Sequence, residues 1–383
     1  WVCDQTEKSN DTFEDYGLFT QVEQLNKTAL KAHGLDKSGH LYKVNSFDFH
    51  RFEDTIKLAD DPDYNQTAFE GMLEIKGDPD HTKFIEMLDA LNDESQKIDD
   101  VLDTYFDTEN LVYWLAFQIL TGNCDTQNRN CYLYSPLNSN TWYFLDWDND
   151  GMLRKLELSL TGFSDYASWE RGASNYWGNV LFNRALRSKS FRSELDRAVK
   201  DLRSYLTETR LTKMIKHYRE VTESLVFASP DIDNLPVTKD QYEQIAAAIP
   251  AEIEENYKSY RESFKKPMPF YIGVPQIDNG KLRINWDASY DFEARDIRYT
   301  EELARDYDIS DVVFKAEDVL LPEVTCDAPD TGQYFVRVRA TNSDGFTQDA
   351  FDYYVTDDGK HYGMKCFYVQ DGGKVVEDTY EEG

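Results

Sequence analysis

The sequence predicts a protein of mixed α and β structure in two parts, an α+β region followed by an all-β region. Three observations support this division. The chain has 383 residues, more than a single hydrophobic core usually serves. Apolar residues recur at helical spacing up to residue 264 and alternate with a period of two beyond residue 270. Between the two patterns, the Lys-Lys-Pro-Met-Pro stretch at 265–269 contains two prolines and predicts a linker.

Composition limits the classes of function. Hydrophobic residues make up 40% of the chain and aromatic residues 14%, which is typical of globular proteins. The formal net charge of -31 repels phosphate backbones and anionic lipids, which argues against nucleic acids and membrane surfaces as partners. No apolar run reaches the length of a bilayer span. Because the chain starts at Trp1 without a visible signal peptide, we interpret it as processed or trimmed.

The first ninety residues have the pattern of mixed strands and helices. Residues 16–23 and 40–44 are apolar and β-branched enough to predict strands. Residues 80–91 carry apolar side chains on one helical face, and Asp78 or Asp80 is placed to cap that helix.

The middle of the chain predicts a buried helix and a hairpin. Residues 111–120 are apolar nearly all round but too few to span a membrane, so we expect a central buried helix that ends at Gly122. Two apolar runs, 131–134 and 142–145, flank a turn-rich stretch and indicate a β-hairpin. Residues 178–264 then have mostly helical spacing.

The last region predicts an all-β sandwich. Residues 281–286 place Leu282, Ile284 and Trp286 on one face of a strand, and residues 332–340 alternate in the same way. Several short strands in a region of this length fit two packed antiparallel sheets.

Residues that suit phosphoryl transfer lie between 121 and 151. This chemistry needs a carboxylate to orient the attacking hydroxyl and metal ions to hold a triphosphate. Kinases supply a loop Asp, an Asn five positions later, and a second Asp beyond a hairpin. Asp125 and Asn130 have this spacing, and Asp146, Asp148 and Asp150 follow the predicted hairpin.

These patterns resemble the CotH family of atypical protein kinases, named after a spore coat protein. The resemblance spans roughly residues 14–265 in the family's order, and its motifs are Gly122–Tyr134, Trp147–Gly151, Tyr16–Glu23, Gly39–Lys43, and Asn179–Arg184 with Phe191 and Arg192. It implies a shortened two-lobed kinase fold without the usual glycine-rich loop. It also implies ATP-dependent phosphorylation of Ser or Thr hydroxyls in protein substrates, with Mg²⁺ or Mn²⁺.

The resemblance assigns roles to individual residues. Asp125 matches the catalytic Asp that accepts the proton of the substrate hydroxyl. Asn130 matches a metal ligand, and Asp148 matches the metal-binding Asp, a role that Asp146 or Asp150 shares or replaces.

Nucleotide contacts follow from the upstream motifs. Lys43 corresponds to the lysine that contacts the α- or β-phosphate. Glu23 is expected to orient Lys43 or to ligate metal, and Glu86 is a weaker candidate for an ion pair with Lys43.

Two alternatives remain open. Asp146, Asp148, Asp150, Gly151 and Glu157 satisfy the spacing of an EF-hand loop, so Ca²⁺ binding is a second hypothesis. The segment that enters this loop has the pattern of a strand rather than a helix, and the sequence shows no second copy. The other alternative is a catalytically inactive cell-surface or adhesion protein.

The C-terminal region resembles a fibronectin type III domain. Trp286 closes an early strand, and a later strand reads Tyr334-x-Val-Arg-Val-x-Ala340-x-Asn342. We therefore expect a kinase-like domain at 1–266, with part of its small lobe upstream of the sequence, and a fibronectin- or immunoglobulin-like sandwich at 267–383. The β module and acidic surface favour an extracytoplasmic location, either secreted, at the cell surface or associated with a spore coat, among cell-surface or coat proteins.

Cysteine usage leaves two interpretations open. Pairs Cys124–Cys131 and Cys326–Cys366 are close enough in the sequence to form disulfides, whereas free buried thiols explain the same residues equally well.

Overall fold

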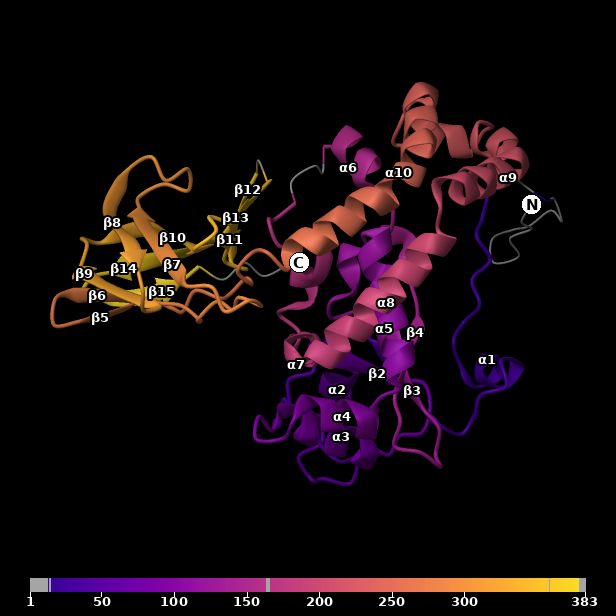
Figure 1. Ribbon diagram of the computed structural model, residues 1–383, viewed down its shortest axis with the longest axis horizontal. Coiled ribbons are helices and arrows are strands. Elements are labelled where there is room, and N and C mark those ends of the chain that lie inside the picture. The colour runs from indigo at the N-terminus through magenta and orange to yellow at the C-terminus, as the bar shows by residue number, and fades with distance from the viewer. Residues whose placement is uncertain (1–12, 14, 163–165, 358, 379–383) are drawn as a thin grey trace.

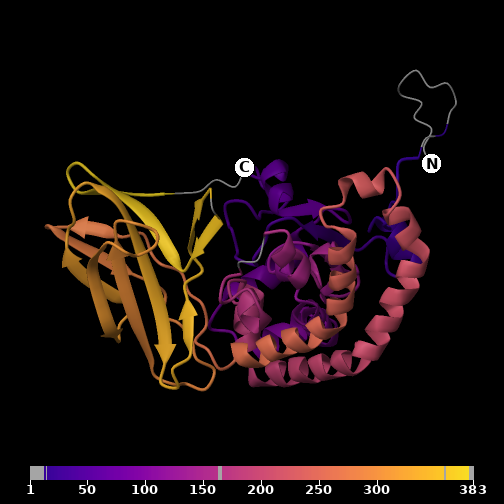
Figure 2. The ribbon, with the colours of Figure 1, turned by 90° about the horizontal axis from the view of Figure 1, so that it is seen from above.

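The computed structural model describes residues 13, 15–162, 166–357 and 359–378. In this part of the chain, the predicted α+β fold is confirmed. Ten α-helices precede residue 264, and the strands beyond residue 270 form antiparallel sheets (Figure 1). Figure 2 shows the two regions side by side and joined along one edge. Within the described residues, no helix has both the length and the apolar character needed to cross a membrane.

A buried helix organises the first region. α5 (Thr108–Thr121) begins at Asp107, whose side chain accepts a hydrogen bond from the backbone of Asn110, and ends at Gly122 with a left-handed φ of 66°. It packs between α8 (Lys189–Tyr205) and α10 (Lys239–Ser263), as Figure 1 shows. The central helix predicted from the apolar run is thus confirmed.

The other helices surround this centre. They are α1 (Lys27–Ala32), α2 (Gln66–Met72), α3 (Thr82–Asn92), α4 (Ile98–Tyr105), α6 (Lys155–Leu160), α7 (Val180–Arg187) and α9 (Glu208–Val226). The predicted helix at 80–91 corresponds to α3, and the Asp80 carboxylate accepts a 2.8 Å hydrogen bond from the backbone of Thr82.

One antiparallel sheet lies against α5 and carries the predicted hairpin. Its strand order is β2 (Leu73–Ile75), β1 (His40–Val44), β3 (Cys131–Ser135) and β4 (Tyr143–Asp146). Lys43 pairs with Glu74 on one side and Tyr132 on the other, and Cys131 pairs with Asp146. This register places the loop before β3 and the segment after β4 at the same end of the hairpin.

The strand predicted at residues 16–23 is wrong. This segment pairs with no strand in the described part of the chain. Gly17 has a φ of 90°, and the backbone nitrogen of Leu18 donates to the Asp231 carboxylate at 3.0 Å. Apolar, β-branched residues favour a strand only where a neighbouring strand binds the backbone, and here Phe19 and Val22 are exposed.

The C-terminal region forms two facing antiparallel sheets and a separate two-stranded sheet, β12-β13. Of the facing sheets, the larger has the order β15-β14-β10-β7-β8, with β11 paired to β10, and the smaller has the order β5-β6-β9. Trp286 lies in the core between them, with Leu282, Ile284 and Tyr299.

The strands are β5 (Gln276–Asp278), β6 (Lys281–Asn285), β7 (Ile297–Ala304), β8 (Val312–Val319), β9 (Glu323–Asp327), β10 (Gly332–Asn342), β11 (Thr347–Asp349), β12 (Tyr353–Thr356), β13 (Gly359–Tyr362), β14 (Met364–Gln370) and β15 (Lys374–Glu377).

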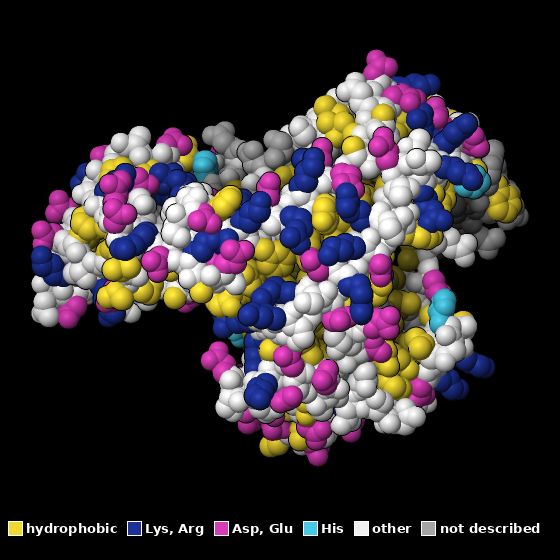
Figure 3. Space-filling model, viewed as in Figure 1, with side chains coloured by type: hydrophobic (Ala, Val, Ile, Leu, Met, Phe, Trp, Pro, Cys, Tyr) yellow, Lys and Arg dark blue, Asp and Glu magenta, His cyan; other side chains and the backbone are white. Residues whose placement is uncertain are grey.

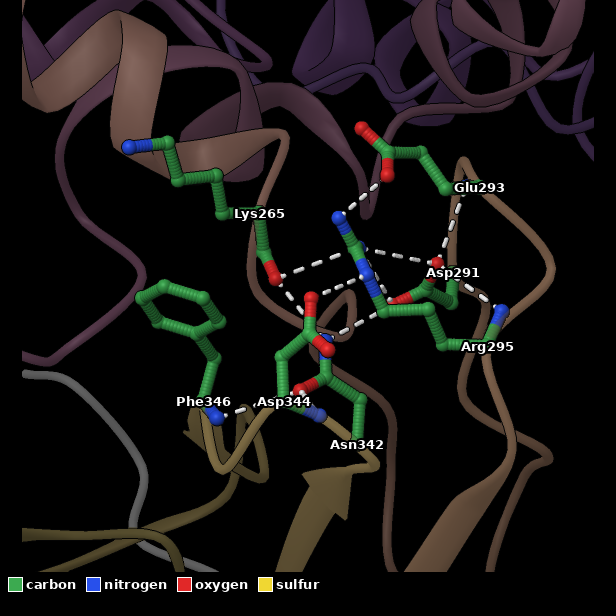
Figure 4. A network of polar contacts seen from close by, with 7 residues as sticks. All are labelled: Lys265, Asp291, Glu293, Arg295, Asn342, Asp344 and Phe346. Carbon is green, nitrogen blue, oxygen red and sulfur yellow. Dashed lines mark hydrogen bonds and ion pairs between the residues drawn. The ribbon is translucent and has the colours of Figure 1, made fainter.

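A polar network fixes the first residue of the linker to the sandwich (Figure 4). The Asn342 amide donates to the Lys265 carbonyl at 2.8 Å and to the buried Asp291 carboxylate at 2.9 Å. Arg295 pairs with Asp291 at 3.2 Å and with Asp344 at 2.8 Å. The start of the linker is therefore held by side chains of the β region.

Apolar packing also joins the two regions. Met268 and Phe351 lie in the same buried cluster as the helical core. Trp177 of the first region stacks with Tyr290 and contacts Phe292 of the second. The boundary at 266/267 stays a prediction, and the two regions bury apolar surface against each other.

Charge is unevenly distributed over the surface. On the face shown in Figure 3, Lys and Arg side chains gather over α8 and α10, and acidic side chains are frequent around the α3–α4 end. The net charge of -31 therefore describes the whole chain rather than each face.

The four cysteines within the described residues are free thiols, and Cys3 lies outside them. Burial raises the pKa of the thiol of Cys124 to about 12. The disulfide interpretation is thus not supported for Cys124, Cys131, Cys326 or Cys366.

A carboxyl group lies unpaired inside the sandwich. Glu301 on β7 is fully buried, and neither of its side-chain oxygens has a hydrogen-bond partner among the described residues. Burial, with a smaller effect from the charge of Glu302, raises the pKa of Glu301 to about 8. Because the charged form is disfavoured inside the core, folding retains the proton on this side chain.

We predict that Glu301→Gln removes a pH dependence of stability. The unfolded chain loses the Glu301 proton near pH 4.5 and the folded chain near pH 8. The free energy of unfolding of the wild type should therefore fall between these values, by about 1.4 kcal/mol per pH unit at most. Urea denaturation at pH 5, 7 and 9, followed by tryptophan fluorescence, measures this free energy. The difference between Glu301→Gln and the wild type should move in favour of the variant as pH rises.

Glu302→Gln is the control, because the Glu302 carboxylate binds Arg337 at 2.6 Å and its pKa is lowered. This variant should have a lower free energy of unfolding than the wild type, and the deficit should not shrink toward pH 9. If the free energies of unfolding of the wild type and Glu301→Gln change with pH in parallel, Glu301 does not have the raised pKa.

Candidate functional site

The loop from Gly122 to Asn130 connects α5 to β3 and carries Asp125. Asn123 is buried, and its side-chain oxygen accepts a 3.4 Å hydrogen bond from the backbone of Asp125 in the 3₁₀ turn η1 (Cys124–Thr126). Asn130 has a left-handed φ of 58° and leads directly into β3. The chain thus reverses direction tightly, with Asp125 near the start of the turn.

The structure brings the side chains of Asp125 and Asn130 together on this loop. The Asn130 amide donates to one carboxylate oxygen of Asp125 at 2.8 Å. Nε of Arg129 lies 2.7 Å from the other oxygen. The side chains of Asp125 and Arg129 are about half exposed. One hydrogen bond and one ion pair therefore hold the Asp125 carboxylate while leaving it accessible.

The acidic segment after β4 returns to this loop. The backbone of Asp148 is left-handed, with a φ of 56°, and precedes the turn η2 (Asn149–Gly151). A Cβ added at Gly151 would lie 2.6 Å from the Asn123 side-chain oxygen and 3.7 Å from Cβ of Asp125. Glycine therefore permits a close approach of the segment to the Asp125 loop.

A buried glutamine joins the loop to the acidic segment. The Gln118 amide on α5 donates to the Asp146 carboxylate at 2.9 Å and to the Asn149 side chain at 3.3 Å. Its carbonyl accepts a 3.0 Å hydrogen bond from the Asn123 amide. The sequence prediction missed Gln118. The available signal was a single amide in an otherwise apolar helix, because such a group must find partners when buried.

The three candidate carboxylates have different surroundings. All three are exposed at the surface. Partial desolvation raises the pKa of Asp146, and the hydrogen bond from Gln118 opposes this shift. Asp148 has no hydrogen bond or ion pair with the described residues, so its oxygens are available to a ligand.

The donor set at this end of the hairpin fits a hard divalent cation. Asp148 offers carboxylate oxygens, and the Asn130 amide donates its N–H to Asp125, which leaves its oxygen for another partner. Carboxylate and amide oxygens suit Mg²⁺, which also takes phosphate oxygens and water. Among the described residues, no group of three or more His, Cys, Asp or Glu side chains is arranged to hold a metal by itself.

Lys43 lies close to the acidic segment. Its Nζ is 5.7 Å from the ring centroid of Trp147, the residue before Asp148. Glu23 instead binds His33 at 2.7 Å, and Glu86 is exposed on α3. In the described part of the chain, no ion pair joins Lys43 to either glutamate, so the predicted roles of these glutamates have no geometric support.

The geometry does not form an EF-hand. Asp146 ends strand β4, so no helix enters the loop. Glu157 lies on α6, and both of its side-chain oxygens bind Arg154, at 2.8 and 3.0 Å. The sequence spacing matches the calcium pattern, but the carboxylate that would close the loop, Glu157, already binds Arg154.

A large cavity lies away from the Asp125 loop, where the two regions meet. Its volume is about 760 Å³, and its lining includes Trp177 and Gly178 of the helical region and Tyr271 and Phe351 of the β region.

Comparison with known protein families matches residues 7–260 to the family described as CotH kinase protein. A search among curated proteins gave no match. Among solved structures, the Twitchin kinase region from C. elegans shares 18% identity over 25% of this chain and 20% of that chain, with a TM-score of 0.19. A likeness this weak carries no argument about fold or function.

We predict that Glu157→Gln leaves metal binding unchanged, because the Glu157 carboxylate is engaged by Arg154. Calorimetric titration with Ca²⁺ in the absence of nucleotide should give no micromolar binding in either protein. Asp103→Asn, at an exposed position on α4 outside the acidic segment, serves as the control. Micromolar Ca²⁺ binding that is lost in Glu157→Gln would instead support the calcium hypothesis.

Proposed function

Because the chain belongs to the CotH kinase protein family, we propose that it is an ATP-dependent kinase that phosphorylates Ser or Thr hydroxyls of protein substrates. The observation that best supports this is the 2.8 Å bond between Asn130 and Asp125, on a loop between a buried helix and a hairpin. The far strand of that hairpin leads into an acidic segment beside the loop. Phosphoryl transfer depends on positioning and charge neutralisation, and this arrangement suits both.

Asp125 would orient the attacking hydroxyl. It would accept a hydrogen bond from that hydroxyl and take its proton late in the transfer. Arg129 forms an ion pair with one carboxylate oxygen and the Asn130 amide donates to the other, and an ionised carboxylate has about four acceptor positions. Acceptor capacity therefore remains on both oxygens, with the carboxylate already held in one orientation.

Asp148 and Asn130 would hold the metal, and Asp146 or Asp150 would share that role. Mg²⁺ or Mn²⁺, when bound with ATP, neutralises charge on the phosphate oxygens. Lys43, beside Trp147, would contact the α- or β-phosphate. We also propose a secreted, cell-surface or spore-coat-associated location, with coat or surface proteins as substrates.

We predict that Asp125→Asn lowers turnover by at least about 100-fold and leaves ATP affinity nearly unchanged, because it removes the proton acceptor and no phosphate contact. The measurement is transfer of labelled phosphate from ATP to a mixed protein substrate, with phosphoserine and phosphothreonine identified. Asp103→Asn, an exposed position on α4, should behave as the wild type. Near wild-type transfer by Asp125→Asn would refute the assignment.

We predict that Asp148→Ala abolishes metal-dependent nucleotide binding, because it removes a carboxylate that has no other partner among the described residues. Calorimetric titration with ATP in Mg²⁺ and in EDTA separates the metal-dependent part of the affinity. If Asp146→Ala or Asp150→Ala abolishes it and Asp148→Ala does not, another of the three carboxylates is the principal ligand.

A further inference from the structure

Residues 166–178 lie directly against the Asp125 loop. The Arg171 guanidinium donates to the Gly122 carbonyl at 2.8 Å, and the Asn175 amide donates to the Cys124 carbonyl at 3.2 Å. The Tyr176 and Thr126 hydroxyls are 2.9 Å apart, and both side chains are buried. These contacts hold both the backbone and a side chain of the loop.

The same segment is bound from its other side by the β region. The ring of Trp169 packs edge-on against Phe351, with centroids 4.9 Å apart, and both residues are buried. The Ser168 hydroxyl donates to the Asp349 carboxylate at 3.0 Å and accepts from the Gln348 amide at 2.8 Å. Three neighbouring side chains of the sandwich therefore hold two neighbouring residues of the segment.

Hydrogen bonds within the segment connect its contacts with the Asp125 loop to its contacts with the β region. The Trp169 carbonyl accepts a 2.9 Å hydrogen bond from the Ser174 hydroxyl, which also donates to the Arg171 carbonyl at 3.0 Å. On the sandwich side, Asp349 pairs at 2.9 Å with Arg339 of the long strand β10. A continuous series of bonds thus leads from β10 through residues 168–176 to the Asp125 loop.

We propose that the β region is a working part of the active site, because it holds residues 166–178, which in turn position the Asp125 loop. Ser168 and Trp169 are the positioning residues at this contact, with Gln348, Asp349 and Phe351 as their partners. The family match ends at residue 260, so this support comes from outside the matched region. The expected effect on turnover rests on the proposed kinase function, whereas the expected effect on loop order does not.

Loss of this contact should release the loop and slow catalysis. In the full-length protein, Phe351→Ala should speed hydrogen exchange of the amides at 122–126 by about tenfold or more, because local opening becomes easier. It should lower kcat by about tenfold and leave the KM for ATP within about twofold, since small misplacement of a catalytic group affects the transition state most.

Ser168→Ala provides a milder test if Phe351→Ala fails to fold. It removes the hydroxyl between Gln348 and Asp349 and leaves the aromatic packing in place, so a smaller change in the same direction is expected. Leu282→Ala is the matched control, because Leu282 is fully buried in the sandwich core, lies on β6 of the smaller sheet, and belongs to a different cluster from Phe351. It should destabilise the β region without changing exchange at 122–126.

The exchange measurement decides the proposal independently of activity. If Phe351→Ala, or Ser168→Ala where the first variant does not fold, loosens residues 168–170 while exchange at 122–126 stays as in the wild type, the proposal is overturned. Faster exchange at 122–126 supports it even where the wild type transfers no phosphate, a result that would refute only the proposed kinase function.

Discussion

The need to satisfy one buried amide shapes the candidate site. Gln118 is fully buried on α5, and an unpaired amide at that depth would cost about 1–3 kcal/mol. Its partners are Asn123 of the Asp125 loop, and Asp146 and Asn149 of the acidic segment. A residue of a buried helix therefore connects two segments that are separated along the chain by the β3–β4 hairpin, and the candidate site residues lie on these two segments.

The sequence was informative wherever local pattern and burial coincide. The all-round apolar helix, the hairpin and the alternating strand before Trp286 were all predicted, because each carries its period in its own residues. The spacing of Asp125 and Asn130 placed both residues on one loop, and the structure adds the hydrogen bond between them. The strand at 16–23 failed because strand formation depends on a partner elsewhere in the chain. The EF-hand spacing at 146–157 does not fix the element that enters the loop, and the strand pattern predicted for that element is confirmed by β4.

Long-range contacts carried no such signal. Ser168 and Gln348 are 180 residues apart in the sequence. No local sequence pattern around either residue predicts their hydrogen bond. The linker prolines suggested two independent units, whereas Met268 and Phe351 pack into the helical core and Asn342 holds the Lys265 carbonyl. The proline-containing linker at 265–269 therefore does not separate two independently packed cores. An acidic net charge likewise conceals the Lys and Arg side chains over α8 and α10 in Figure 3.

The left-handed backbones of Asn130 and Asp148 restrict how this site can change in the course of evolution. Asn, Asp and Gly adopt this conformation most readily, and β-branched residues resist it. Glycine at either position would preserve the chain path while removing a side-chain oxygen of the candidate site. Relatives with glycine at these two positions are therefore expected to keep the fold without the two side chains on which the proposed phosphotransfer depends.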